Sequence, residues 1–347
     1  MKKFLSMLLV LVLTLSMGTV AFAEETPTDM GTVTITKNYN ATNTGTTSPA
    51  EEFKFKISAT SVTDASAGVT VENMPVPTID TVSYSDGDAG KEGSMSKQIT
   101  VTLPTYTSVG IYTYTIKETA GTTAGVTYYG EDIKLVVTVI QQDDGKIRVA
   151  AVHTEGADVT AKSDNFPNEY SAGSLAVSKT VTGNMGDQSK EFDVTVTFTA
   201  PEGKTVNSVI TYTDGDVSKS IVPASSTATG DSVTKWTENN KATVKISLKH
   251  NETVTFANIP YGVTYTVEES DYTSEENGGY DTAAYNYSDE ANKKIDSASD
   301  TVTITNSKGV EVDMGIGLDS LPYILLLAFV VIGLTVFFVK RRTAREN

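Results

Sequence analysis

Cysteine is absent from all 347 residues of the sequence. Disulfide bonds and thiolate metal ligands are therefore excluded, and any covalent reinforcement of the fold must use other side chains. Histidine is nearly absent too, since His153 and His250 are the only two and neither has another histidine nearby. The sequence therefore does not provide the residues for a histidine-rich metal site or a histidine-based catalytic triad. We expect no metal, no cofactor and no conventional enzymatic activity.

Basic residues are scarce as well. The chain has 27 Lys and Arg against 43 Asp and Glu, which gives a formal net charge of −16, and six of the basic residues lie near the two ends. Proteins that bind nucleic acid or anionic lipid surfaces use clustered Lys and Arg. The acidic central part therefore argues against nucleic acid as a partner and suits a soluble extracellular protein.

The N-terminal end carries one of two long apolar runs. Residues 1–23 combine two early lysines, an apolar run and an Ala-Phe-Ala cleavage site, which together predict a secretory signal peptide. We expect the mature, exported chain to begin at Glu24.

The second apolar run, Leu321 to Val339, lies near the other end. As a helix it would be about 28 Å long, which matches the core of a bilayer. The basic tail at residues 340–347 follows at once, and positive charge after a span holds a tail in the cytoplasm and leaves the preceding chain outside. We expect a transmembrane helix over 321–339; a buried core helix is the alternative.

Between the two ends the chain shows no long helical pattern. Four segments alternate with period two and are rich in β-branched and aromatic residues, as strands are. They are Thr32–Thr36, Phe53–Ile57, Tyr112–Ile116 and Val194–Phe198. Asp144-Gly145, between two further apolar segments, predicts a hairpin. Short strands separated by such turns predict an all-β chain of immunoglobulin-like β-sandwiches.

The chain also repeats one order of elements. Each copy has a lysine on its first strand, a Tyr-x-hydrophobic-x-Glu strand in the middle and an asparagine on its last strand. These residues are Lys37, Glu118 and Asn168 in the first copy, and Lys179, Glu269 and Asn306 in the second. The repeat predicts two tandem domains, at residues 24–171 and 172–309, with a short linker over 171–174.

Both copies resemble the isopeptide-bonded domains of Gram-positive pilins and surface adhesins, namely the streptococcal backbone-pilin and collagen-adhesin B-type sandwiches. The resemblance covers nearly all of residues 30–308. It implies that Lys37 forms an amide bond with Asn168, and Lys179 with Asn306, each assisted by the glutamate of its own copy. Alignment with Glu118 selects Glu269 over its neighbour Glu268 as the second glutamate.

The implied chemistry is coherent at the level of the side chains. Burial among apolar groups disfavours the charge of lysine and of glutamate alike, so a neutral amine can attack while a neutral carboxyl assists. The amine would then displace ammonia from the asparagine amide. Taken singly, each such residue is more often solvated surface charge or a turn residue.

Residues 310–320 correspond to the place where sortase substrates carry a Leu-Pro-x-Thr-Gly or Val-Pro-Thr-Gly motif. Val312-Asp313-Met314-Gly315 stands there instead, without the proline and the threonine. We expect either cleavage between Met314 and Gly315 by a tolerant sortase, which leaves the protein attached to the cell wall, or retention as a single-pass membrane protein.

If the chain polymerises with other pilin subunits, some lysine must supply the attacking amine. Lys162 resembles the placement of that lysine in backbone pilins, although a lysine in such a loop is usually just solvated. The favoured function is a structural fibre or stalk subunit. The alternatives are an adhesin that binds a host or bacterial ligand through its loops, and an enzyme with an unrecognised site. We expect the single Trp236 to pack in a core.

Overall fold

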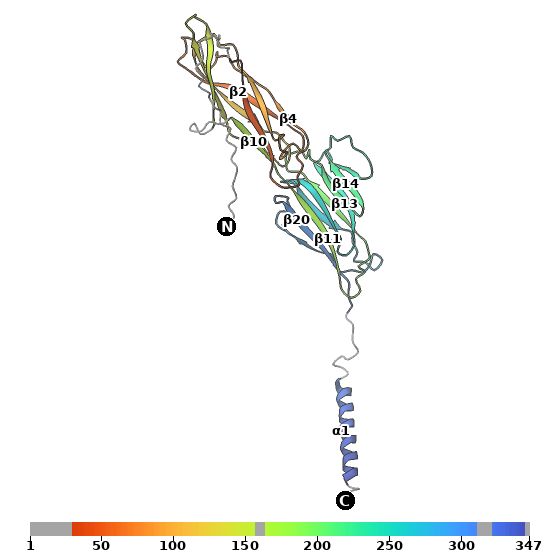
Figure 1. The fold of residues 1–347 in the computed structure, drawn as a ribbon. Coiled ribbons are helices and arrows are strands. Elements are labelled where there is room, and N and C mark those ends of the chain that lie inside the picture. The colour runs from red at the N-terminus through yellow and green to blue at the C-terminus, as the bar shows by residue number, and fades with distance from the viewer. Residues whose placement is uncertain (1–29, 157–163, 311–320, 344–347) are drawn as a thin grey trace.

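The computed structural model describes residues 30–156, 164–310 and 321–343. The strands up to Tyr170 form one elongated β-sandwich, and those from Ala172 to Ser307 form a second. The two sandwiches lie end to end (Figure 1), and residues 321–343 form a helix. The predicted fold, an all-β chain of two tandem sandwiches followed by one apolar helix, is confirmed.

The first sandwich consists of two facing sheets. One has the strand order β3-β5-β1-β10-β7 and the other has the order β4-β2-β6-β8-β9. The strands of the first sheet are β3 (Thr78–Ile79), β5 (Ser96–Thr102), β1 (Thr32–Ala41), β10 (Asn165–Tyr170) and β7 (Val126–Thr127). Those of the second sheet are β4 (Val82–Tyr84), β2 (Glu51–Thr63), β6 (Gly110–Thr119), β8 (Ile133–Gln141) and β9 (Ile147–Glu155). The predicted Asp144-Gly145 hairpin joins β8 to β9, with Gly145 at a φ of 85°.

The second sandwich pairs a wide sheet with a narrow one. The wide sheet has the order β15-β14-β13-β17-β11-β20-β19, and the narrow one has the order β16-β12-β18. The wide sheet contains β15 (Val233–Lys235), β14 (Val217–Val222), β13 (Ile210–Asp214), β17 (Thr253–Pro260), β11 (Ala172–Thr182), β20 (Ser299–Ser307) and β19 (Ala284–Tyr287). The narrow sheet contains β16 (Lys241–Leu248), β12 (Phe192–Thr199) and β18 (Thr264–Glu269). Trp236, which follows β15, is only 5% exposed and packs in the second core, so core packing is confirmed.

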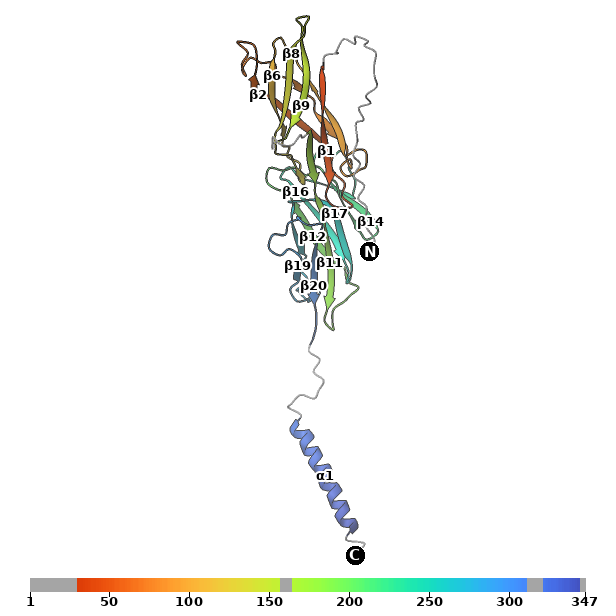
Figure 2. The same cartoon turned by 60° about the vertical axis from the view of Figure 1, so that its left-hand side comes forward.

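In each domain the first and last strands are neighbours and run parallel. β1 pairs with β10, and β11 pairs with β20; Figures 1 and 2 both show β20 beside β11. Lys37 lies opposite Phe166, two residues before Asn168. Lys179 lies opposite Ile304, again two residues before Asn306. The two domains therefore place lysine and asparagine in the same relative register.

Alternation along the strands directs these lysines inward. Ile35, Lys37 and Tyr39 are all fully buried, because residues two apart on a strand share one face. In the second domain Lys179 lies between two buried valines, Val177 and Val181. Each lysine thus occupies a core position between apolar neighbours.

The predicted linker over residues 171–174 is wrong. β10 ends at Tyr170 and β11 begins at Ala172, so only Ser171 lies between the two domains. Gly173 belongs to β11, and a Cβ at this position would lie 2.2 Å from the carbonyl oxygen of Ser297. The small residues reflect close packing of β11 rather than a flexible connection.

Two segments of the first domain contact the second on either side of this connection. Tyr170 pairs with the end of β1 on one side and with the start of β7 on the other, so the loop after β1 and the loop before β7 flank Ser171. Thr47 lies in the loop after β1. Its N–H and C=O both form hydrogen bonds with the side chain of Asn258 on β17, at 3.0 and 2.9 Å.

The loop before β7 adds to the second domain directly. The Thr205 N–H donates to the carbonyl oxygen of Thr122, and the Ala124 N–H donates to the carbonyl oxygen of Thr205, at 2.8 and 2.9 Å. Ala124 is 2% exposed and packs within the apolar core of the second domain. The first domain therefore contributes one residue to the core of the second.

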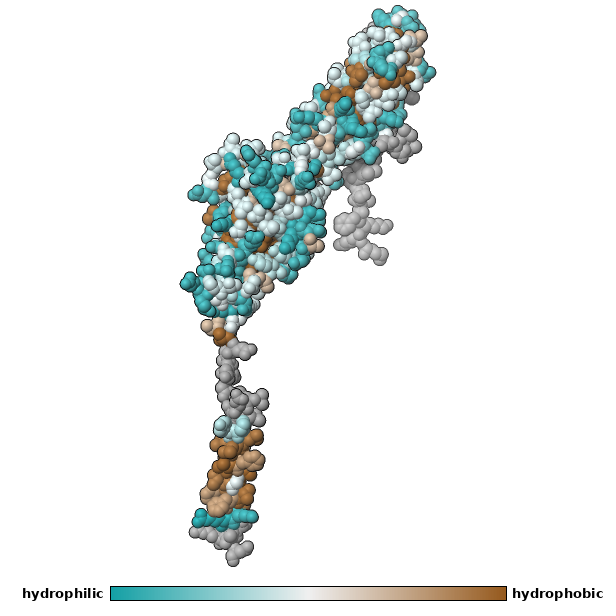
Figure 3. All heavy atoms as spheres, turned by 180° about the vertical axis from the view of Figure 1, so that it is seen from behind, coloured by the Kyte–Doolittle hydropathy of each residue, from teal (hydrophilic) through white to brown (hydrophobic). Residues whose placement is uncertain are grey.

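The C-terminal helix α1 (Leu321–Thr343) runs four residues beyond the predicted span. Three basic residues occupy its last turn, where cations interact favourably with the carbonyl end of a helix. Its apolar side chains are exposed, and Figure 3 shows the helix as a brown band below two domains with mainly teal and white surfaces. By length and composition, residues 322–342 are sufficient to cross a membrane.

Candidate functional site

The first candidate site lies inside the first domain, between its two sheets. Lys37 comes from β1, Asn168 from the adjacent β10, and Glu118 from β6 of the facing sheet. The Lys37 Nζ atom donates to Oε2 of Glu118 at 2.9 Å, and Nδ2 of Asn168 donates to Oε1 of the same carboxyl. The structure thus brings together the three residues that the repeat singled out, with one glutamate oxygen facing each nitrogen.

Neighbouring groups fix the lysine. Its Nζ also donates to the carbonyl oxygen of Phe166 at 2.9 Å and lies 4.2 Å from the centroid of the Phe53 ring. The Lys37 and Glu118 side chains are both 0% exposed. Water is therefore excluded from the amine, which is held by two oxygen acceptors and one aromatic face.

Burial shifts both ionisable groups toward their neutral forms. It lowers the pKa of Lys37 to about 8, against the opposing attraction of Glu118. It also raises the pKa of Glu118, although Lys37 and the hydrogen bond from Asn168 act in the other direction. Both shifts favour the state in which a neutral amine lies beside a neutral carboxyl.

The second domain contains the corresponding site. Lys179 of β11 donates to Oε1 of Glu269, the last residue of β18, at 2.6 Å, and also to Oδ1 of Asn306 on β20. The Nζ atom lies 4.1 Å from the centroid of the Phe192 ring. Glu268 is exposed, so the strand turns Glu269 and not its neighbour toward the lysine.

The two sites differ in detail. Burial lowers the pKa of Lys179, and Glu269 opposes that shift. The Oε2 atom of Glu269 is buried and has no hydrogen-bond partner among the described residues. The second glutamate therefore contacts its lysine alone, whereas Glu118 bridges lysine and asparagine.

Other predicted site residues lie outside the described residues. These are Lys162, Met314 and Gly315, together with the predicted signal peptide over 1–23. The described residues contain no cluster of three or more His, Cys, Asp or Glu side chains suited to a metal ion.

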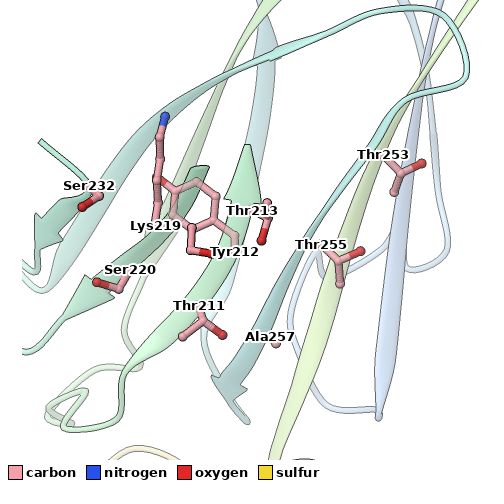
Figure 4. A pocket seen from close by; sticks show the side chains of 10 residues that line it. Thr211, Tyr212, Thr213, Lys219, Ser220, Ser232, Thr253, Thr255 and Ala257 are labelled. Atoms are coloured by element: carbon pink, nitrogen blue, oxygen red, sulfur yellow. The ribbon is translucent and has the colours of Figure 1, made fainter. Parts of the chain in front are cut away.

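A shallow groove on the second domain is lined mainly by hydroxyl groups. β13 and β17 pair at a single position, Thr211 with Ala257. Beyond that position Thr213 of β13 faces Thr255 of β17 across the groove (Figure 4). The lining residues include no carboxylate or imidazole that could activate these hydroxyl groups, so the groove suggests no reaction.

Sequence reasoning missed two features of the sites. The rings beneath the lysines, Phe53 and Phe192, each follow a glutamate directly in the sequence, Glu52 and Glu191, and this shared Glu-Phe pair could have indicated them. The main-chain N–H of Tyr129 donates to Oδ1 of Asn168 at 3.0 Å. A main-chain donor has no sequence signature, so this contact could not have been found from the sequence.

Comparisons with known proteins agree with this arrangement. Residues 33–171 match the Spy0128-like isopeptide containing domain, and residues 173–308 match a domain of unknown function (DUF7601). A curated pilin of Streptococcus pyogenes serotype M1 is 26% identical over 275 residues, which is 76% of each chain.

Solved structures show the same fold. The crystal structure of the major pilin from Streptococcus pyogenes has a TM-score of 0.54 at 24% identity, over 82% of this chain and 100% of that one. The T3.2 major pilin of the same species has a TM-score of 0.52 at 21% identity, over 81% and 99%.

The fold, the paired buried sites and these relatives define a class: bacterial surface proteins built from tandem isopeptide-type β-sandwiches. Within it, residues 33–171 belong to the Spy0128-like isopeptide containing domain family, and the chain is similar to streptococcal pilins over most of its length. It is a structural subunit of the pilin type, and the adhesin alternative is not favoured. The curated relative that it matches is named a pilin.

Proposed function

We propose that this chain is a fibre subunit in which each domain is closed by a self-formed amide bond, between Lys37 and Asn168 in the first domain and between Lys179 and Asn306 in the second. One observation carries the proposal. Both domains bury the side chains of a lysine, a glutamate and an asparagine together, with the lysine and asparagine in the same parallel register. Unrelated surface charges would not recur in this arrangement.

The nucleophile is the neutral amine of the lysine. An amine has two N–H groups, and in the first domain Glu118 and the carbonyl oxygen of Phe166 accept from Nζ. Those two acceptors leave the nitrogen lone pair free to attack the side-chain carbon of Asn168. The lowered pKa of Lys37 makes this form accessible.

The glutamate moves the proton. As the Nζ–Cγ bond forms, Oε2 of Glu118 takes a proton from the amine and Oε1 delivers one to Nδ2 of Asn168. The Cγ–Nδ2 bond breaks and ammonia leaves. The carboxyl returns to its starting state, so the reaction needs no cofactor and occurs once in each domain.

Such bonds would stabilise the domains considerably. By analogy with a disulfide, closing a loop of more than 100 residues removes unfolded-state entropy worth about 5 kcal/mol. That is a large fraction of the stability of an ordinary domain. In a fibre under tension, the bond would also carry load between the terminal strands.

Export and attachment complete the proposal. The predicted signal peptide would direct secretion, and α1 would hold the C-terminal end in the membrane until a sortase cuts between Met314 and Gly315. Lys162 would supply the amine that joins one pilin subunit to the next.

The test is the intact mass of the purified ectodomain, residues 24–310. Each bond expels one ammonia, about 17 Da, so we expect the measured mass to lie about 34 Da below the mass calculated from the sequence. Replacing Glu269 by Ala should halve the deficit. Glu268→Ala is the matched control, since this neighbour is exposed, and should leave the full deficit.

A measured mass equal to the calculated mass would refute the crosslinks. The chain would then consist of two ordinary sandwiches with buried ion pairs. Tandem mass spectrometry of tryptic peptides would identify the joined residues directly, as branched peptides that contain the β1 and β10 segments or the β11 and β20 segments.

A further inference from the structure

We propose that the main-chain N–H of Tyr129 is a catalytic group of the first domain, where it stabilises the oxyanion that develops on Asn168 during bond formation. This inference rests on the proposed crosslink. The contact that carries it is the hydrogen bond from Tyr129 N to Oδ1 of Asn168, at 3.0 Å.

This contact determines the orientation of the asparagine amide. A main-chain N–H can only donate, so the atom that faces it must be the amide oxygen. The amide nitrogen then points to Oε1 of Glu118, as the structure shows. The leaving group faces the proton source, and the carbonyl oxygen faces a fixed dipole.

The local fold frees this N–H group from the sheet. β7 pairs with β10 only at Val126 and Thr127, and Tyr129 lies two residues beyond the end of the strand. Pro167, which precedes Asn168 on β10, has no N–H and cannot form a reciprocal ladder pair, so the pairing ends before Tyr129. Beyond the end of the ladder, the Tyr129 N–H donates to the Asn168 side chain.

The chemical role follows from where charge develops. When the Lys37 amine attacks, the C=O bond of Asn168 becomes a single bond and its oxygen becomes negative. A donor held in place beside that oxygen, in a site without water, stabilises the transition state more than the ground state. The site is dry, since Asn168 is fully buried.

The second domain is built differently at this position. Among the described residues, the hydrogen bond to Oδ1 of Asn306 comes from Lys179 itself. β19 pairs with β20 up to Thr305, one residue before this asparagine. No main-chain donor corresponds to Tyr129 within the described chain, so we expect the first bond to form faster than the second.

The test replaces one atom group in the full chain. The full chain is made by cell-free synthesis into lipid nanodiscs, with Tyr129 exchanged for its α-hydroxy acid analogue. This exchange replaces the main-chain N–H by an ester oxygen and keeps the side chain. A Glu269→Ala background silences the second site, so that loss of ammonia reports the first site alone. Isotope-pulsed chains are sampled over time, and their intact mass gives the rate.

We expect the ester variant to react on the order of 100-fold more slowly, the effect of removing one oxyanion donor. Tyr129→Ala keeps the N–H and should react at close to the parent rate. Resistance of the first domain to protease checks that both variants fold.

An ester variant that reacts as fast as its parent would overturn the proposal. So would an equal slowing in Tyr129→Ala, because the effect would then come from packing of the ring against Phe166. If the parent itself loses no ammonia, the crosslink proposal fails as well, and the two failures are thereby distinguished.

Discussion

At the residue scale, the central feature is a lysine in a core position. Burying an unpaired ammonium is costly, and removing the partner of a buried ion pair typically destabilises a protein by about 3–5 kcal/mol. Lys37 is tolerated because Glu118, a carbonyl oxygen and an aromatic ring surround its nitrogen. Conversion of the amine into an amide would remove the buried charge permanently.

The same pair predicts how bond formation depends on pH. The reaction needs one proton on the pair, which is delivered to the leaving nitrogen. The pKa of Lys37 is about 8 and that of Glu118 is raised above its usual range by burial. We therefore expect the rate in the first domain to pass through a maximum between these two pKa values and to fall above about pH 8.

The measurement is the rate of the first 17 Da loss in Glu269→Ala, from pH 5 to 10. The rate falls at high pH because the pair has then lost the proton that the leaving group requires. A rate that continues to rise above pH 9 would contradict the shuttle role of Glu118 and leave the amine as the only titrating participant.

The identities of the site residues could be predicted from the sequence, but their hydrogen bonds could not. Two matched sets in the same order indicated the lysine, glutamate and asparagine, and alignment with Glu118 selected Glu269 over Glu268. The orientation of the Asn168 amide depends on Tyr129, a residue in neither set. Such contacts arise from how neighbouring strands end, which periodicity does not encode.

At the element scale, contacts on both sides of Ser171 join the two domains. The loop before β7 adds a main-chain pairing to Thr205 and places Ala124 in the second core. Within the first domain, Thr123 fixes this loop by donating to Glu51 at 2.6 Å. Part of the second core is therefore completed by a loop that the first domain holds in place.

This coupling can be tested with the sole tryptophan, which lies in the second domain. We expect Ala124→Asp, a change in the first domain, to lower the denaturant midpoint of the Trp236 fluorescence transition, because a charge would enter the second core. The effect should be about 1–3 kcal/mol. An unchanged midpoint would show that the loop does not complete that core.

Thr122→Ala is the matched control for this experiment. The Thr122 side chain is exposed, and only its carbonyl oxygen contacts Thr205. The denaturant midpoint of the Trp236 fluorescence transition in Thr122→Ala should equal that of the parent chain. Hydrogen exchange in β10 would verify that the first domain remains folded in both variants.

The predicted strands and their alternation agree with the structure, whereas the predicted linker does not. Ala172, Gly173 and Ser174 have the composition of a flexible connection, yet they begin β11. A side chain at Gly173 would collide with residues 295–298, which approach the strand closely. Composition alone does not distinguish a residue that is small for flexibility from one that is small for packing.

At the scale of the whole molecule, the crosslinks would define the path of force. Tension that enters at β1 would pass from Lys37 to Asn168, cross Ser171 into β11, and leave through Lys179 and Asn306. The other strands lie outside this path. The sandwiches would then bear tension through covalent bonds, while the hydrogen-bonded sheets remain unloaded.

Single-molecule pulling tests this path. We expect the parent chain, held at residues 30 and 310, to show no domain-sized extension. Glu118→Ala should release one step of about 450 Å, and the double variant with Glu269→Ala should release two, at about 3.5 Å per residue. Large steps in the parent chain would show that the sheets carry the load.

The adjacency of the first and last strands would have a separate consequence at a cell surface, where proteases cut exposed loops. The exposed loops of the first domain between β2 and β3 and between β4 and β5 lie between Lys37 and Asn168 in sequence. With those two side chains joined, a cut in any such loop opens the chain into a branched molecule without releasing a fragment. A nicked subunit would still connect its two neighbours, so a fibre of such subunits would survive cleavage that severs an ordinary polypeptide.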